Sequence, residues 1–163
     1  MQLRIHKEGW VYFVISCLIT IIIIPFYTIL GIFLIIISSY IFYFFRDPIR
    51  AVPTNEVVVS PADGLVTYIG VEKNPLDDEK DQNTYTKISI FLSVFDVHVN
   101  RMPVKGSISS INYIPGKFLN ATLDKSSKEN ERNIIFAKYN NDSLYIVQIA
   151  GLIARRIVCN LKV

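Results

Sequence analysis

The sequence predicts a mainly β (α+β) domain on the cytoplasmic side of a membrane, preceded by an N-terminal helical membrane hairpin. Two observations support this fold class. Residues 11–45 carry no charged side chain, and short runs of alternating apolar and polar residues follow residue 56. We therefore divide the chain into a membrane-associated helical hairpin at residues 1–48 and an incomplete β-rich domain at residues 49–163.

The apolar segment is too long for one straight membrane span. As a single helix it would reach about 52 Å at about 1.5 Å per residue, whereas the hydrocarbon core is about 30 Å thick. We expect two short spans, at residues 10–25 and 30–45. Basic residues lie at both ends (Arg4 and Lys7 before the segment, Arg46 and Arg50 after it), so the positive-inside tendency places both ends in the cytoplasm, at the cell membrane. A hairpin dipped into one leaflet is the alternative.

Composition limits the classes of function. The net charge of +3 suits contact with anionic lipid, but no dense basic run indicates binding to nucleic acid. Two cysteines provide no disulfide framework. Since His6 and His98 are the only histidines, we expect no multi-histidine metal site.

Five runs after residue 56 have the composition and alternation of strands. They are residues 65–71, 86–94, 108–114, 134–139 and 144–149. Polar residues 140–143 predict a hairpin turn between the last two runs. Acidic residues 77–81 predict a solvated loop, and polar residues 120–131 predict a short helical turn.

Residues 88–102 contain the side chains most suited to catalysis. If this segment is extended, alternate side chains share one face, which begins apolar and ends in Asp96, His98 and Asn100. A carboxylate, an imidazole and an amide at the rim of the core could hold a general base together with the acid that orients it. The alternative is a histidine that is only hydrogen-bonded at a strand end.

Several other motifs are turn-like, and each also has a functional interpretation. Asp63 lies in a Ser-Pro-Ala-Asp-Gly turn and could find a partner elsewhere. Lys117 and Arg155 could each meet a phosphate group. Residues 130–132 could form a solvated corner or part of a polar site, and Arg46 could snorkel to the membrane interface.

Six motifs occur in a fixed order along nearly the whole chain. They are Phe-Phe-Arg-Asp-Pro (44–48), Ser-Pro-Ala-Asp-Gly (60–64), Phe-Leu-Ser-Val-Phe-Asp-Val-His-Val-Asn-Arg-Met-Pro (91–103), Pro-Gly-Lys-Phe (115–118), Asn-Glu-Arg (130–132) and Ile-Ala-Gly-Leu-Ile-Ala-Arg-Arg-Ile-Val-Cys (149–159). Together these motifs closely resemble the short bacterial and archaeal-type branch of the phosphatidylserine decarboxylase family.

The resemblance implies a pyruvoyl-dependent carboxy-lyase of phospholipid biosynthesis. Members of the family are proenzymes that cut themselves before a serine, which becomes a pyruvoyl group on a small α chain. That group serves as an electron sink while phosphatidylserine loses carbon dioxide and becomes phosphatidylethanolamine. The implied partners are a phospholipid membrane, the α chain, phosphatidylserine and further copies of the chain in a homo-oligomer.

The resemblance also suggests roles for individual residues. His98 and Asp63 match the family's histidine and aspartate, which imply a base that activates the serine and an acid that supports the base. His98 would also donate a proton during decarboxylation. Longer-branch relatives carry a second histidine where this chain has an arginine. The candidate substrate-binding residues are Asp96, Asn100, Arg101, Lys117 and Arg155.

The sequence ends at Val163 without the family's cleavage motif, and its one Gly-Ser dipeptide, at residues 106–107, stands at an expected turn. We therefore expect a C-terminally truncated β-chain portion that is inactive alone, with a pyruvoyl group that comes from a serine beyond Val163. Two alternatives stay open: a catalytically inactive, membrane-bound relic that binds lipid, and a membrane-anchored adaptor that shares the β architecture.

Overall fold

The computed structural model describes residues 4–55, 57–76, 83–120 and 126–163, which form two compact units. The first unit contains the N-terminal helices together with residues 62–64 and 92–101. The second contains residues 57–61, 65–91 and 102–163, apart from the gaps just given. The predicted solvated loop at residues 77–81 lies outside the described residues. The predicted domain division at residue 48 stays a prediction. Residues 62–64 and 92–101 belong to the first unit although they lie within the sequence range of the second, so the chain passes between the two units more than once.

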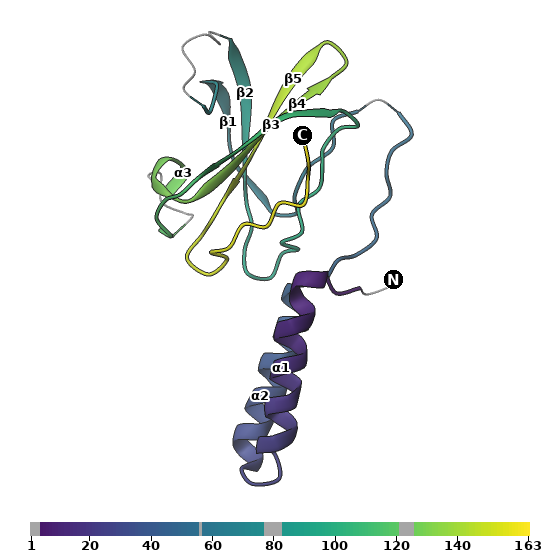
Figure 1. Cartoon of the computed structure of the whole chain (residues 1–163), viewed down its shortest axis with the longest axis vertical. Helices are drawn as coiled ribbons and strands as arrows, with labels where there is room; N and C mark the ends of the chain where they lie inside the picture. The colour runs from purple at the N-terminus through teal and green to yellow at the C-terminus, as the bar shows by residue number, and fades with distance from the viewer. Residues whose placement is uncertain (1–3, 56, 77–82, 121–125) are drawn as a thin grey trace. The chain divides into compact units, whose positions relative to one another are not determined.

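Two antiparallel helices, α1 (Lys7–Ile23) and α2 (Thr28–Phe44), lie side by side in the first unit (Figure 1). His6 caps α1 by accepting a hydrogen bond from the amide of Glu8, and Pro25 follows the C-cap, where it prevents the helix from continuing. The helices meet through small residues. The Ser16 and Ser38 hydroxyl oxygens lie 2.6 Å apart, and both residues are buried. Most of the large apolar side chains therefore lie on the outside of the pair.

The prediction of an N-terminal membrane hairpin is wrong. Because the chain turns after Ile24, the uncharged segment divides into two helices of 17 residues each. A helix of that length reaches about 25 Å, against a hydrocarbon core of about 30 Å. In the part of the chain that the structure describes, no helix is both long enough and apolar enough to cross a membrane.

The second unit contains two antiparallel sheets. Strands β1 (Leu65–Lys73) and β2 (Thr84–Phe91) form a two-stranded sheet. Strands β3 (Ser107–Ile114), β4 (Arg132–Tyr139) and β5 (Asp142–Ile149) form a three-stranded sheet with β4 in the centre. The short helix α3 (Ser126–Glu129) precedes β4, within the range where the sequence predicts a helical turn.

The core of the second unit is built on the central strand, β4. Ile134 and Ala137 are fully buried and Ile135 is 3% exposed. A hairpin turn joins β4 to β5, and Asn140 takes the left-handed conformation there, with φ at 52°. Asparagine tolerates this conformation better than other non-glycine residues, which explains why residues 140–143 predict a turn.

Candidate functional site

A tight turn follows β2 and sets the position of the candidate catalytic segment. The amide of Asp96 donates to the carbonyl oxygen of Ser93 (3.0 Å), and the amide of Ser93 donates to the Asp96 carboxylate (2.8 Å). Two hydrogen bonds to the carboxylate hold the pKa of Asp96 below its usual value: the larger effect comes from the Ser93 hydroxyl and the smaller one from the Ser93 amide. Because the strand ends at Phe91, the expected alternation of side chains over residues 88–102 is interrupted before His98.

His98 is half-buried and is held through one ring nitrogen. Its Nδ1 lies 3.0 Å from the backbone carbonyl oxygen of Asp96. A carbonyl oxygen only accepts, so this hydrogen bond places the proton on Nδ1 and leaves the lone pair of the neutral ring on Nε2. Among the residues that the structure describes, Nε2 has no hydrogen-bond partner. His98 thus has the form of a neutral base with one free nitrogen.

Burial lowers the pKa of His98, and the positive charge of Arg46 lowers it further, although more weakly. The hydrogen bond to the backbone of Asp96 and the Asp96 carboxylate act in the opposite direction, but burial prevails. The lowered pKa favours the uncharged imidazole, the form that a proton acceptor requires.

The C-terminal end of α2 forms an aromatic wall beside His98. The ring of Phe44 packs against the imidazole, with the ring centroids 4.3 Å apart and the planes inclined by 31°. The hydroxyl of Tyr40 donates to the carbonyl oxygen of Val94 (3.1 Å). Sequence reasoning missed both aromatic residues, although Phe44 begins the Phe-Phe-Arg-Asp-Pro motif, which could have directed attention to it.

Arg46, which follows the end of α2, also contacts this segment. Its guanidinium donates to the carbonyl oxygens of Tyr43 (2.8 Å) and Phe95 (2.7 Å). It also lies 3.8 Å from the centroid of the Tyr43 ring, within the range of a cation–π interaction. Arg46 therefore links the end of α2 to the turn that precedes His98.

Arg101, a predicted substrate-binding residue, lies at the other end of the same segment. Its guanidinium forms an ion pair with Asp47 and donates to the carbonyl oxygen of Pro48 (2.9 Å). Both contacts are with the chain itself, so Arg101 has a structural role in the first unit. Asn100, the neighbouring candidate, is half-buried.

Asp63, the second predicted catalytic residue, forms an ion pair with Arg50. Gly64 follows it with φ at 136°, a conformation that residues with a side chain rarely adopt, and this glycine allows the chain to turn there. In the described part of the chain, no hydrogen bond or ion pair joins Asp63 to His98. The carboxylate is therefore engaged by a guanidinium, and the imidazole by a backbone carbonyl.

Lys117 and Arg155 lie in the second unit. Lys117 is exposed, and its ammonium group contacts the Glu129 carboxylate at 2.8 Å, a hydrogen bond that raises the pKa of Lys117. Arg155 donates to the carbonyl oxygen of Leu152 (2.9 Å) and lies 5.8 Å from the centroid of the Phe118 ring. Because Phe118 follows Lys117 directly, the two cationic residues belong to one neighbourhood of this unit.

Asn130 organises that neighbourhood, and sequence reasoning left its role open. Its side chain is fully buried and accepts from the amide of Leu119 (2.9 Å) while donating to the carbonyl oxygens of Leu119 (2.9 Å) and Ala150 (2.8 Å). It thereby ties the loop after β3 to the end of β5. Residues 130–132 therefore begin with a buried structural residue.

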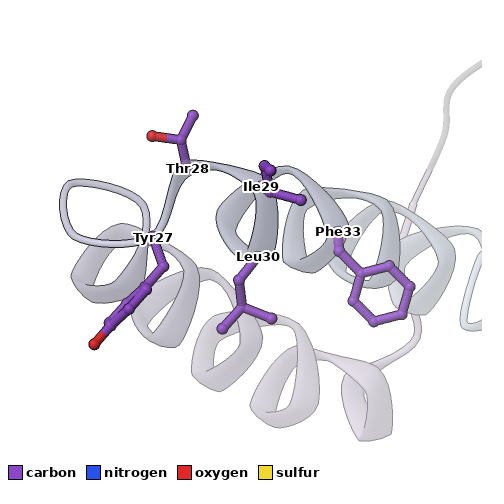
Figure 2. Close-up of a pocket in the computed structure, with 5 residues that line it drawn as sticks. All are labelled: Tyr27, Thr28, Ile29, Leu30 and Phe33. Atoms are coloured by element: carbon purple, nitrogen blue, oxygen red, sulfur yellow. The ribbon is translucent and has the colours of Figure 1, made fainter.

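An open apolar hollow of about 740 Å³ lies at the turn between the helices (Figure 2). It is lined by Tyr27, Thr28, Ile29, Leu30 and Phe33. Phe44 lies at the opposite end of α2, about 24 Å away along the helix axis. This hollow is thus remote from His98, and its lining contains no charged side chain. The described residues contain no group of three or more potential metal ligands.

Comparisons with known proteins match most of the chain. The sequence model of a family described as phosphatidylserine decarboxylase matches residues 37–163. A phosphatidylserine decarboxylase proenzyme from Ehrlichia chaffeensis is 50% identical over 162 residues, which is 98% of this chain and 70% of the relative. Proenzymes of the same name from Pelagibacter ubique and Cereibacter sphaeroides are 46% and 42% identical. Each covers 96% of this chain, which in turn spans 74% and 68% of their lengths.

Proposed function

The chain belongs to the phosphatidylserine decarboxylase family, and from this premise we propose that it is the β-chain portion of a pyruvoyl-dependent carboxy-lyase. Its substrate is phosphatidylserine and its product is phosphatidylethanolamine. Its partner is the α chain, which carries the pyruvoyl group after the proenzyme has cut itself. Because the substrate is a phospholipid, the reaction takes place at a lipid surface.

The state of His98 is the observation that carries the mechanism. Burial lowers the pKa of His98 and favours the neutral ring, and the Asp96 carbonyl oxygen lies 3.0 Å from Nδ1. Among the described residues, Nε2 has no hydrogen-bond partner. Self-cleavage requires a base that takes the proton of a serine hydroxyl, and Nε2 of His98 is suited to this task. The same nitrogen, once protonated, can return a proton to the substrate carbon after carbon dioxide has left.

The residues around His98 fit a site for the pyruvoyl group. Once formed, this group supplies a carbonyl that withdraws electrons from the bond to the departing carboxylate. Phe44 covers one face of the imidazole and limits access of water to it, while Arg46 adds positive charge nearby. A partly dry and positively polarised surrounding stabilises negative charge as it develops on a substrate.

The other candidate residues have supporting roles in this proposal. Asp96 closes the turn before His98, and Asp63 acts through its ion pair with Arg50. Asn100 and Arg101 shape the same segment. Lys117 and Arg155 supply positive charge for the phosphate of the lipid headgroup.

The two histidines allow a matched test. The chain is produced as a proenzyme with the α-chain segment of the Ehrlichia chaffeensis relative, and self-cleavage is followed by mass spectrometry. His98→Ala is expected to slow self-cleavage about 10²- to 10⁴-fold, the usual contribution of a general base. His6→Ala serves as the control because, within the ranges that the structure describes, the His6 side chain hydrogen-bonds only to the amide of Glu8 at the start of α1. Equal rates in the two variants would refute the role of His98.

Decarboxylation is measured separately, as release of carbon dioxide from vesicles that contain phosphatidylserine. The cleaved His6→Ala protein should convert the lipid to phosphatidylethanolamine. If it is fully cleaved and carries a pyruvoyl group but leaves phosphatidylserine unchanged, the proposed substrate is wrong.

A further inference from the structure

We propose that Phe44 is a positioning residue for His98: its ring, held at the end of α2, keeps the imidazole in the orientation that leaves Nε2 free. This inference rests on the proposed role of His98 as the base. Two contacts define the orientation of the imidazole. Phe44 covers its face at a centroid distance of 4.3 Å, and the Asp96 carbonyl oxygen binds its edge at 3.0 Å.

Each contact constrains a different motion. The hydrogen bond selects the tautomer and fixes the direction of Nδ1, but on its own it allows the ring to tilt about that bond. An aromatic ring packed against the imidazole opposes the tilt, since tilting would separate two surfaces in van der Waals contact. To turn about its Cβ–Cγ bond, the imidazole would have to leave the Asp96 carbonyl oxygen and push against the Phe44 ring, so Phe44 also opposes this rotation.

Phe44 can act in this way because the structure ties α2 to the segment that contains His98. The Tyr40 hydroxyl binds the carbonyl oxygen of Val94 (3.1 Å), and the Arg46 guanidinium binds that of Phe95 (2.7 Å). Tyr40 precedes Phe44 in α2 and Arg46 follows the end of the helix, so these hydrogen bonds lie on either side of Phe44 along the chain. The helix that carries the Phe44 ring is therefore hydrogen-bonded to the segment that carries the imidazole of His98.

The electrostatic surroundings of His98 come from the same elements. The charged groups that affect the imidazole are Asp96, on its own segment, and Arg46, at the end of α2. Neither is removed by a substitution at Phe44. A change in the titration of His98 in such a variant therefore reports the loss of burial and orientation.

Nuclear magnetic resonance of the imidazole groups in the purified full chain tests the proposal without an activity assay. The chain has two histidines, so a His6→Gln background leaves the His98 signals alone. In Phe44→Leu the imidazole of His98 becomes less buried, so its pKa should rise towards that of an exposed imidazole. The ¹⁵N chemical shifts of the ring should change from those of a single tautomer, with the proton on Nδ1, to values that report a mixture of both tautomers. Phe44→Tyr keeps the ring and should preserve both properties.

Phe42→Leu is the matched control, because Phe42 lies on the same helix but packs against Phe13, with the ring centroids 5.4 Å apart. It should leave the His98 signals unchanged. If Phe44→Leu does not fold, Phe44→Met replaces it, since methionine fills irregular space in cores. A folded Leu or Met variant with the wild-type pKa and tautomer of His98 would overturn the proposal.

Self-cleavage of the proenzyme provides the functional readout. Loss of orientation in Phe44→Leu should slow the reaction about 10- to 100-fold, and Phe44→Tyr should restore it. The acidic limb of the rate against pH should move to higher pH, as the pKa of His98 does. If the signals change as expected but the rate does not, Phe44 still positions His98, and the role of His98 as the base is what fails.

Discussion

The guanidinium of Arg46 donates a hydrogen bond of 2.7 Å to the carbonyl oxygen of Phe95, three residues before His98. Arg46 follows the end of α2, so this bond connects the helical part of the first unit to the segment that carries the candidate base. The connection explains why residues 92–101 group with the helices, although they follow directly on β2.

Replacing Arg46 with lysine should weaken this connection. Lysine keeps the positive charge but cannot donate from one planar group to the carbonyl oxygens of Tyr43 and Phe95 together. We expect a loss of about 1 kcal/mol in the free energy of unfolding, measured with urea, and slower self-cleavage. Arg156→Lys, at an exposed site, should change the stability by less than about 0.5 kcal/mol. Equal losses of stability in Arg46→Lys and Arg156→Lys would contradict the proposed connection between α2 and Phe95 through Arg46.

The ion pair between Asp63 and Arg50 predicts that substitutions of either residue have similar effects. We expect Asp63→Asn and Arg50→Gln to slow self-cleavage to a similar extent, because each removes the same contact. The double variant should be no slower than either single variant, as expected for residues that act as a pair. A much slower Asp63→Asn variant beside a normal Arg50→Gln variant would instead indicate that the carboxylate acts directly on His98.

The pKa of His98 predicts how stability depends on pH. Burial lowers this pKa below its ordinary value of 6.5, so near and below pH 6.5 the unfolded chain binds the proton more readily than the folded chain. The stabilisation from neutral His98 is therefore fully present above that pH and declines as the pH falls towards the folded pKa. Urea unfolding across this interval should show a weaker pH dependence in His98→Gln than in the wild-type protein, and an unchanged dependence would contradict the prediction.

The contact between Ser16 and Ser38 should stabilise the helix pair. Ser38→Ala removes a buried hydrogen bond of 2.6 Å and leaves the Ser16 hydroxyl without this partner, for an expected loss of about 1–2 kcal/mol. Ser39→Ala is the control, because Ser39 is exposed and, like Ser38, donates to the carbonyl oxygen four residues earlier. Thermal unfolding followed by circular dichroism would compare them. Equal melting temperatures would show that the contact contributes nothing.

Asn130→Ala should be the most destabilising of these changes. It removes three side-chain hydrogen bonds at a fully buried position and leaves the carbonyl oxygen of Ala150 without this donor. We expect a loss of about 3 kcal/mol or more in the free energy of unfolding. Asn112→Ala provides the comparison, because that half-buried side chain donates one hydrogen bond, to Ser110. A loss no larger than that of Asn112→Ala would argue against the structural role of Asn130.

Local signals in the sequence identify much of the secondary structure. Pro25 marks the end of α1, and Asn140 lies in the turn of the β4–β5 hairpin, because both residues restrict the backbone locally. The sequence predicts a strand to residue 94, but β2 ends at Phe91. Ser93 and Asp96 close a turn there through hydrogen bonds, which the pattern of apolar residues does not reveal. The lack of charge over residues 11–45 gave the wrong result for the membrane hairpin, although the turn between its two helices was placed correctly, because neither helix is long and apolar enough to cross a membrane.

The sequence by itself determined the family and singled out His98, because motif order and residue type are properties of the chain. Only the tertiary structure decided how the imidazole is held. The Phe44 ring packs against the imidazole from a segment distant in sequence, and the Asp96 backbone carbonyl binds Nδ1. Arg46 holds the preceding turn at Phe95. The protonation of an imidazole depends on its burial and on nearby charge, and both arise only when the chain has folded.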